Sequence, residues 1–268
     1  MERPSWVPGG VDIEQPSVAR VYDYYLGGSH NFEADRAFAD QVMSAVPDMP
    51  WVIQENRAFL RRAVRFIAEQ GVDQFLDLGS GIPTVGNVHE IVTLVNPSAR
   101  VLYVDHDPVA VAHSRAILDG SPIASIVSGD LRSPSEVLAN SDVRRVIDFT
   151  RPVGVLLNAV LHFVPDDAEA QRIVAELGRS VPAGSYIGIS HASADQMQVG
   201  AQRTESLYNR SVAAMSMRTL AEVTALFGDL PLVDPGVVQI PLWKPESVDD
   251  VSQAAARYPG YAGVARVD

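Results

Sequence analysis

The residue types best suited to bind a ligand lie in FLDLGSGIPTVG, residues 75 to 86. An apolar strand is predicted to end at Leu78, and Gly79, Ser80 and Gly81 then turn the chain. Glycine lets the backbone approach a ligand closely, and we expect the next helix to begin here with free N–H groups. The turn therefore predicts a site for an anionic or hydroxyl-rich group. A turn of this kind can also serve only to bend the chain, so other motifs have to decide.

Two interpretations of this turn compete. A nicotinamide-dependent enzyme requires G-x-G-x-x-G and an acidic residue about 20 positions later. Gly79, Gly81 and Asp105 satisfy part of that pattern, but the position of the third glycine is occupied by Thr84. The alternative includes Asp77 and gives D-x-G-x-G, the signature of the S-adenosylmethionine-dependent methyltransferases. Those enzymes resemble the dinucleotide-binding fold but hold an amino acid where the pyrophosphate would lie.

Two later segments favour the methyltransferase interpretation. VLYVDHDP resembles the second methyltransferase motif. This resemblance implies that Asp105 accepts hydrogen bonds from both ribose hydroxyls and that His106 lies beside the adenine. SGDLRSP resembles the third motif, in which Asp130 would meet the adenine amino group with Leu131 as its backbone neighbour.

Two further segments continue the same order of motifs. LLNAVLHFVPDD, at 156–167, resembles the fourth strand of small-molecule methyltransferases and the segment after it. VPAGSYIGIS, at 181–190, resembles the proline-glycine turn into their fifth strand. Asn158 could hydrogen-bond the methionine part of the cofactor or the acceptor, or it could satisfy local backbone groups.

Short apolar strands that alternate with helices from residue 71 onward must position these motifs. Near-continuous apolar strands, each followed by a helix, predict a doubly wound parallel sheet with ligands at the carboxyl ends of its strands. The predicted strands are 74–78, 100–105, 123–128, 152–160 and 185–191. Segments 237–243 and 260–267 are predicted to form a closing antiparallel pair. SPSE predicts a capping box, with Ser133 as the N-cap and Glu136 at N3.

Helical periodicity dominates before residue 71. A short helix is predicted from the i, i+3, i+4, i+7 spacing of four side chains, those of Val18, Val21, Tyr22 and Tyr25. Tyr22 would therefore point inward and Asp23 elsewhere. Gly27 and Gly28 are expected to stop this helix and act as a hinge. Two more helices are predicted, and the second carries Arg57 on its apolar stripe, where a cation needs a partner.

The N-terminal segment extends the resemblance to nearly the whole chain. PSVARVYDYYLGGSHNFEADR, ENRAFLRRAV, DLGSGIPT and PGVVQIPLW together resemble an actinobacterial family of S-adenosyl methyltransferases, first catalogued as a domain of unknown function, within the class I superfamily. The resemblance implies an α/β fold with a Rossmann-like seven-stranded sheet, mostly parallel with a C-terminal antiparallel strand and helices on both faces. It also implies S-adenosylmethionine as cofactor and S-adenosylhomocysteine as product. Residues 1–70 would form an N-terminal helical lid, and residues 71–268 the methyltransferase core of one compact unit.

If the lid covers the carboxyl edge of the sheet, its side chains face the ligands. Tyr22 and Tyr25 would then pack toward the methionine end of the cofactor, with Gly28 also near it. The loop after the first helix would wall the acceptor pocket with three side chains, those of His30, Asn31 and Phe32. An ordinary amphipathic helix packed on the core would show the same aromatic stripe.

Two charged residues suit the amino-acid part of the cofactor. Asp77 can meet its amine or cap nearby N–H groups. Arg57 can pair with its carboxylate, or it can bridge to Asp35 or to another helix. The predicted cofactor contacts are Tyr22, Gly28, Arg57, Asp77, Gly79, Ser80, Gly81, Asp105, His106, Asp130, Leu131 and Asn158.

Two histidines are candidates for acid–base chemistry. A base is needed only if the methyl acceptor carries a proton at the working pH. His162, after the fourth strand, is the first candidate because an ordinary imidazole has a pKa near 6.5. His191, at the end of the fifth strand, is the second, and either residue can instead be a structural hydrogen-bonding group. No H-E-x-x-H or comparable ligand spacing occurs, so no metal site is predicted.

Composition limits the classes of partner. The chain has 21 basic and 33 acidic residues, a net charge of −12 and no Lys/Arg-rich run, which argues against nucleic-acid binding. No apolar stretch reaches the roughly 18 residues of a membrane span, and the first residues do not resemble a signal peptide, so no membrane partner is expected. With no cysteine in the chain, a cytoplasmic protein is the simplest expectation. A homodimer is compatible with the sequence but is not specified by it.

The combined motifs predict an S-adenosylmethionine-dependent methyltransferase that acts on an oxygen or nitrogen atom of a small molecule. The alternative is a binding protein that senses S-adenosylmethionine or S-adenosylhomocysteine without turnover. An NAD-dependent oxidoreductase is disfavoured by Thr84 and by the lack of a catalytic Tyr-x-x-x-Lys, because the chain's one lysine, Lys244, is far from any such tyrosine.

Overall fold

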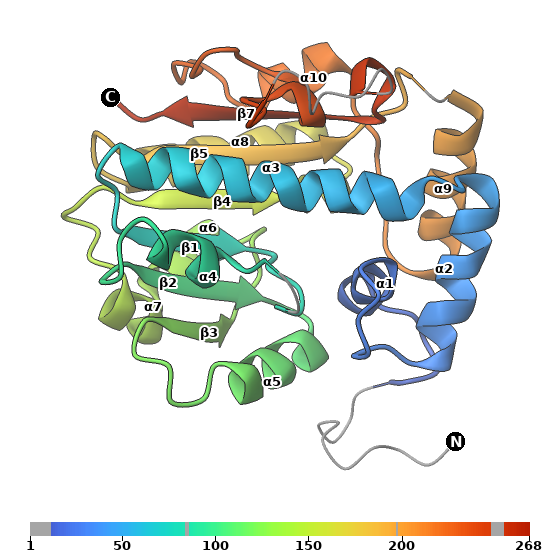
Figure 1. Cartoon of the computed structure of the whole chain (residues 1–268), viewed down its shortest axis with the longest axis horizontal. Helices are drawn as coiled ribbons and strands as arrows, with labels where there is room; N and C mark the ends of the chain where they lie inside the picture. Colours follow the sequence, from blue (N-terminus) through green and yellow to red (C-terminus); the bar gives the residue numbers. More distant parts are fainter. Residues whose placement is uncertain (1–11, 84–85, 197, 248–254) are drawn as a thin grey trace.

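A single seven-stranded sheet forms the centre of the protein, shown in Figure 1 as a computed structural model that describes residues 12–83, 86–196, 198–247 and 255–268. The strand order is β3-β2-β1-β4-β5-β7-β6. The strands are β1 (Gln74–Leu78), β2 (Arg100–Asp105), β3 (Ala124–Ser128), β4 (Gly154–Asn158), β5 (Tyr186–Ala192), β6 (Val238–Gln239) and β7 (Gly260–Arg266). Strands β1 to β5 are parallel, and β7 pairs antiparallel with both β5 and β6. The predicted Rossmann-like α/β class is confirmed.

The parallel strands form from apolar runs that are buried on both faces. All five residues of β1 are buried. Two consecutive residues of this strand, Phe75 and Leu76, belong to the cores on opposite faces of the sheet. Such strands cannot alternate polar and apolar side chains, which is why they read as continuous apolar segments. The order of the strands in the sheet reverses direction at β1, which lies between β2 and β4. A ligand is therefore expected at the carboxyl ends of these strands.

The observed strand boundaries show which strands can be predicted from local sequence patterns. The predicted strands 74–78 and 100–105 are confirmed to the residue. The predicted strand 152–160 is too long, because Ala159 adopts a φ of 52° and turns the chain out of the sheet. Segment 237–243 is a strand only at its start, since Pro241 lacks an N–H for the ladder and a 3-10 helix, η2 (Ile240–Leu242), follows.

Helices cover both faces of the sheet and its carboxyl edge. They are α1 (Val18–Tyr25), α2 (Glu33–Ala45), α3 (Met49–Glu69), α4 (Val88–Thr93), α5 (Pro108–Ile117), α6 (Pro134–Ala139), α7 (Ser141–Val146), α8 (Asp167–Ser180), α9 (Gln198–Ser211) and α10 (Leu220–Ala225), with short 3-10 helices η1 (Leu161–Phe163) and η4 (Ala255–Arg257). Ser133 is the N-cap of α6, but its side chain makes no capping hydrogen bond, so the predicted capping box does not form. Within the described residues, no helix has the length and hydrophobicity needed to cross a membrane.

The carboxyl ends of the parallel strands point toward α1, α2 and α9 (Figure 1). These three helices pack together through one apolar cluster that includes Val21, Phe38 and Tyr208, and we call them the helical lid. Helix α3 connects the lid to the core, because Ile53 packs in the lid cluster and Phe59 packs on the sheet face. The predicted division at residue 70 therefore falls at the end of a helix that both parts share.

Candidate functional site

A cavity of about 470 Å³, which we call the larger cavity, lies between the helical lid and the carboxyl edge of the sheet. Helix α1 is fixed over this edge by a hydrogen bond from the Ser17 hydroxyl to the Asp107 carboxylate and by apolar contact of Ala19 with Ile82. Eleven of the twelve predicted cofactor contacts line the larger cavity: Tyr22, Arg57, Asp77, Gly79, Ser80, Gly81, Asp105, His106, Asp130, Leu131 and Asn158.

The glycine turn is held by its own backbone donors. The N–H groups of Gly79 and Ser80 donate to the carbonyl of Val104, at 2.8 and 3.2 Å, and the N–H of Gly81 donates to the Asp105 carboxylate at 2.7 Å. These bonds join the end of β1 to the end of β2. The turn therefore presents few free N–H groups to a ligand, unlike a phosphate-binding loop.

The helix expected directly after the turn begins later. Helix α4 starts at Val88, so the prediction of a helix N-terminus at the turn is wrong. Gly79 is still required, because its φ is +70° and an added Cβ would lie 2.3 Å from Cγ2 of Val160. Thr84, on which the argument against a dinucleotide site partly rested, lies outside the described residues.

Asp105 is buried at the end of β2 with both carboxylate oxygens facing backbone donors. Oδ1 accepts from the N–H of Asp107 at 2.8 Å and Oδ2 accepts from Gly81. Burial raises the pKa of Asp105, although these two N–H groups favour the ionised form. A carboxylate oxygen can accept more than one hydrogen bond, so each oxygen can still accept from a ligand hydroxyl. His106 beside it is largely exposed, with Nδ1 3.8 Å from Asp105 Oδ1.

Asp77 and Arg57 bring opposite charges to the same wall of the larger cavity. Burial raises the pKa of Asp77 to about 7, and the Arg57 guanidinium partly opposes that rise. Arg57 also donates to the carbonyl of Gly86 at 3.1 Å. The alternative partner considered from sequence, Asp35, is instead bound by Arg20, with Nε and Oδ2 2.8 Å apart.

The Asp130 carboxylate is paired with a cation that sequence reasoning missed. Arg132 donates through Nη2 to Oδ2 at 2.6 Å and through Nε to Oδ1 at 3.0 Å. Hydrogen bonding from Arg132 holds the pKa of Asp130 below its usual value. Both side chains line the larger cavity, so a ligand there would meet an ion pair rather than a lone carboxylate.

A chain of polar side chains joins the lid to the end of β4. Asn56 donates to the hydroxyl of Tyr22 at 2.8 Å, and Ser190 Oγ lies 2.7 Å from both Asn56 Oδ1 and Asn158 Oδ1. Sequence reasoning missed Asn56 and Ser190. Asn56 carried a signal, since it is a polar residue three positions after Ile53 on the apolar stripe of α3.

The loop after α1 folds around a buried carboxylate. Asp23 is only 1% exposed and accepts from the His30 N–H at 2.8 Å and from Asn31 Nδ2 at 2.9 Å, so it points into this loop, on a different side from Tyr22. An added Cβ at Gly28 would lie 2.0 Å from Asp23 Oδ1. Gly28 was predicted to contact the cofactor, and His30, Asn31 and Phe32 were predicted to wall the acceptor pocket. Among the described residues, none of these four lines the larger cavity or the smaller cavity next to it. These residues build the loop instead.

A second, smaller cavity of about 110 Å³ adjoins the first and lies between the lid and the end of β5. The two cavities share four lining residues, namely Val18, Tyr22, Ala159 and Phe163. Ala159 adopts a left-handed backbone conformation, which is uncommon for a residue with a Cβ and is often found at functional sites. Both candidate bases, His162 and His191, line the smaller cavity.

Both ring nitrogens of His191 are occupied. Nδ1 lies 2.7 Å from the carbonyl of Ala192, which can only accept, so Nδ1 carries the proton. Nε2 accepts from Nη1 of Arg218 at 2.8 Å. Burial lowers the pKa of His191 to about 3. Arg218 is 1% exposed and also binds the carbonyl of Leu161, so this histidine is held neutral within a structural network.

His162 is differently placed. Its side chain is buried and its Nδ1 has no hydrogen-bond partner among the described residues. Burial, His191 and the positive charge of Arg218 hold its pKa well below the usual 6.5. The ring is therefore a neutral hydrogen-bonding group, and accepting a full proton there is unfavourable. No group of three or more potential metal ligands occurs in the described part of the chain.

Comparison with known proteins places the chain. A family model described as S-adenosyl methyltransferase matches residues 4–268. The crystal structure of a proposed methyltransferase from Thermobifida fusca YX has 40% sequence identity and a TM-score of 0.91, and the match covers 99% of this chain and 100% of that one. A DUF574 family protein from Streptomyces avermitilis has 36% identity and a TM-score of 0.91, with 96% and 99% of the two chains covered.

A more distant structure shares the fold alone. An O-methyltransferase family protein from Burkholderia thailandensis has 14% identity and a TM-score of 0.51, and the match covers 91% of this chain and 63% of that one. No functionally curated protein matches the sequence.

Proposed function

The chain belongs to the S-adenosyl methyltransferase family, and we propose that it transfers the methyl group of S-adenosylmethionine to an oxygen or nitrogen atom of a small molecule. The observation that carries this proposal is the contact between two unlike cavities. The larger one is rich in carboxylates and the smaller one has no charged lining residue in the described chain, and Tyr22 and Ala159 border both. Such a junction suits a reaction between a polar, charged donor and a neutral acceptor.

The residues of the larger cavity fit this cofactor. Asp105 retains acceptor capacity for hydroxyl groups, and Asp77 and Arg57 can complement an ammonium and a carboxylate. The hydroxyl of Ser80 is buried there and has no hydrogen-bond partner among the described residues, as expected of a group that binds a ligand. Once bound, S-adenosylmethionine would supply an electrophilic methyl group on its sulfonium sulfur, so that an acceptor lone pair could bond to the methyl carbon while the S–C bonding pair stays on sulfur.

The chain's own residues then have separate tasks. Asp105 holds the ribose, Asp77 and Arg57 hold the amino-acid end, and the Asp130–Arg132 pair borders the adenine side. The Tyr22–Asn56 hydrogen bond keeps α1 and α3 together where the two cavities meet. Positioning and exclusion of water are the main contributions that such a site can make.

The two histidines act on the acceptor side without strong basicity. His162 offers Nδ1 as a hydrogen-bonding group, whereas His191 positions Arg218 and η1. Because both pKa values lie below the usual range, a proton lost by the acceptor passes to solvent rather than remaining on imidazole. An acceptor that is already neutral and nucleophilic suits this arrangement best.

Calorimetry and radiolabelled methyl transfer test the proposal. S-adenosylmethionine and S-adenosylhomocysteine should both bind, whereas NAD should not. Incubation of the protein and labelled cofactor with small-molecule extracts should give a labelled product, with Asp105→Ala as the negative control. Tight NAD binding without cofactor binding would overturn the proposal. Cofactor binding without any labelled product would instead identify a non-catalytic sensor.

A further inference from the structure

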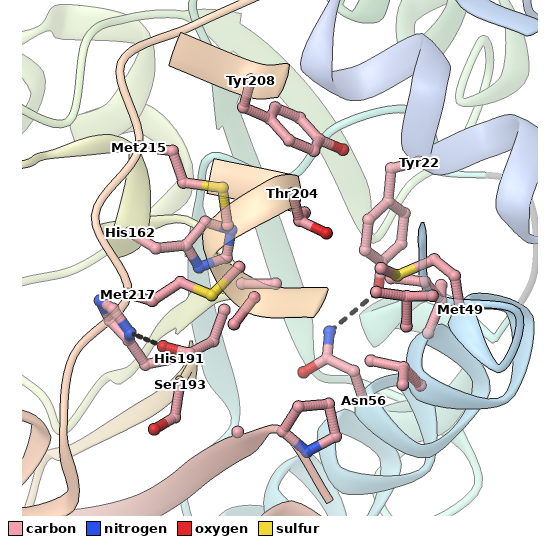
Figure 2. A pocket seen from close by; sticks show the side chains of 18 of the residues that line it. Tyr22, Met49, Asn56, His162, His191, Ser193, Thr204, Tyr208, Met215 and Met217 are labelled. Atoms are coloured by element: carbon pink, nitrogen blue, oxygen red, sulfur yellow. Dashed lines mark hydrogen bonds between the residues drawn. The ribbon is translucent and has the colours of Figure 1, made fainter. Parts of the chain in front are cut away.

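The smaller cavity is closed in by elements that are distant in sequence. Its walls come from α1, the start of α3, α9, the segment after α9 and the end of β5. Figure 2 shows the labelled side chains of this cavity surrounding one common space, with Tyr22 and Met49 on one side and His162 and Met217 on the other. Because Tyr22 also lines the larger cavity, a molecule in this space lies next to the cofactor cavity.

The lining of the smaller cavity is almost entirely apolar and uncharged. Three methionines, Met49, Met215 and Met217, contribute flexible thioether side chains that adapt to the shape of a ligand. No Asp, Glu, Lys or Arg side chain is among its lining residues in the described chain. An ion placed there would lose its hydration without a compensating partner, which is strongly unfavourable. The cavity therefore selects for neutral molecules.

Three buried polar atoms in this lining have no hydrogen-bond partner among the described residues. The Tyr25 hydroxyl lies beside that of Tyr208, whereas the other two atoms are Nδ1 of His162, a residue that is 7% exposed, and Oγ1 of Thr204, a residue that is 3% exposed. Figure 2 shows the side chains of His162 and Thr204 directed toward the interior of the cavity. Buried polar groups are normally hydrogen-bonded, so an orphaned pair that faces one cavity indicates a polar group on the ligand.

We propose that the smaller cavity is the acceptor subsite and that it takes a neutral, single-ring molecule whose hydroxyl group bonds to His162 Nδ1 and Thr204 Oγ1. This inference rests on the proposed function and narrows its acceptor class. At about 110 Å³ the cavity is smaller than an apolar cavity of about 150 Å³ that holds benzene, so a ring fits only with part of it extending into the adjoining larger cavity. Both polar atoms can donate or accept, so together they satisfy the donor and the acceptor of one hydroxyl.

Equilibrium binding of four matched probes tests the proposal without turnover. The protein, saturated with S-adenosylhomocysteine, is titrated with para-cresol, toluene, benzoate and benzylamine and followed by calorimetry or ligand-observed NMR. Para-cresol should bind about tenfold more tightly than toluene, because only its hydroxyl satisfies the two orphaned atoms. Benzoate and benzylamine, which are charged at neutral pH, should bind about a hundredfold more weakly than para-cresol.

Two substitutions assign the preference to the named atoms. Thr204→Val keeps the shape and removes the hydroxyl, and His162→Phe keeps a ring and removes Nδ1. Each should reduce the preference for para-cresol over toluene to about twofold, whereas toluene affinity should stay unchanged or rise. Ser206→Ala, at an exposed position of α9, is the matched control and should leave the preference intact.

The outcomes separate this inference from the proposed function. Failure of S-adenosylhomocysteine to bind would overturn the proposed function itself. If it binds but para-cresol does not, or if a charged probe binds as tightly as para-cresol, only the acceptor inference fails. An unchanged para-cresol preference in both variants would also overturn it, and unchanged S-adenosylhomocysteine affinity in each variant shows that the fold is intact.

Discussion

The two cavities at the carboxyl edge of the sheet differ in chemistry although they meet at Tyr22. The larger one is lined by Asp77, Asp105 and Asp130 together with Arg57 and other polar groups, whereas the smaller one carries apolar side chains and neutral histidines. Charged side chains that face a cavity require a charged or hydrogen-bonding ligand, and an apolar wall requires a neutral one. The difference indicates that one fold holds two unlike molecules next to each other.

The origin of the two cavities differs as well. The larger cavity uses residues at the ends of consecutive parallel strands, which any sheet of this topology brings to one edge. The smaller cavity uses α9 and the segment after it, where Thr204, Met215 and Met217 come to lie opposite α1 and α3. The first cavity therefore follows from the fold class, and the second depends on how the helical lid packs.

Removing the carboxylate of Asp105 should have the largest effect, and that effect should be on ligand binding in the larger cavity. We expect Asp105→Ala to weaken S-adenosylhomocysteine binding at least about a hundredfold, because hydrogen bonds to a charged acceptor contribute about 1.5–3 kcal/mol each. Calorimetry measures the change, with Asp119→Ala at an exposed position as the control. Affinity within about threefold of the wild type would show that this carboxylate does not hold the ribose.

The wall of the larger cavity at Gly79 can be tested by a pair of glycine substitutions. Gly79→Ala forces a Cβ against Val160 at a φ of +70°, whereas Gly120→Ala meets nothing within 4 Å at a φ of +72°. We expect losses of about 3 and about 1 kcal/mol in the free energy of unfolding, respectively. Urea denaturation measures both, and equal losses would mean that the contact with Val160 does not constrain the turn.

The ionisation of Asp77 should make cofactor binding depend on pH. Burial raises its pKa from 3.8 to about 7, so below pH 7 the group is largely protonated and cannot attract an ammonium ion. We expect S-adenosylhomocysteine affinity to rise about tenfold between roughly pH 6 and pH 8. The affinity of Asp77→Asn should vary much less over this range, and calorimetry at several pH values measures the difference.

The same shift has the opposite consequence for stability without ligand. A folded-state pKa above the unfolded value means that the folded protein binds this proton more tightly. The stabilisation is complete below pH 3.8 and is lost as the pH rises through about 7. Relative to Asp77→Asn, the wild type should therefore lose stability across this window, and a parallel course of the two proteins in urea titrations would contradict the assignment.

Loss of the Tyr22 hydroxyl should have the smallest effect. Tyr22→Phe leaves Asn56 Nδ2 without its acceptor at the junction of the cavities and should cost about 1 kcal/mol of unfolding free energy. Tyr24→Phe, on the same helix, removes a long, exposed hydrogen bond to Asp40 and should cost nearly nothing. Thermal unfolding measures both changes, and identical midpoints would show that the Tyr22–Asn56 bond does not stabilise the lid.

Sequence patterns predicted the sheet well because its strands are encoded locally. Continuous apolar runs with turn residues at their ends gave 74–78 and 100–105 without error. The predicted antiparallel pairing of segments 237–243 and 260–267 is confirmed, but the first strand is only Val238–Gln239 because Pro241 interrupts the ladder. The resemblance to the family supplied the complete topology, which periodicity alone did not.

Side chains in loops and between helices were predicted less well. Asp23 is buried by bonds from His30 and Asn31, because a loop can satisfy a carboxylate internally, and helical periodicity carries no information about that. Arg132 pairs with Asp130 two positions before it, and that local spacing was a signal in the sequence. The partners of Arg218, among them Asp167 and His191, are distant in sequence, so only tertiary contact reveals them. The same reason explains why both histidine candidates turned out to be neutral and buried.

By itself, the sequence determined the α/β sheet and the edge at which Asp77, Gly79 and Asp105 meet, because the carboxyl ends of adjacent parallel strands always lie together. Only the tertiary structure decided what lies opposite that edge. Thr204 and His162 come from segments about 40 residues apart and face one apolar cavity because α9 packs against α1 and α2. Cavities between helices are set by packing of distant side chains, and no local pattern of residues encodes them.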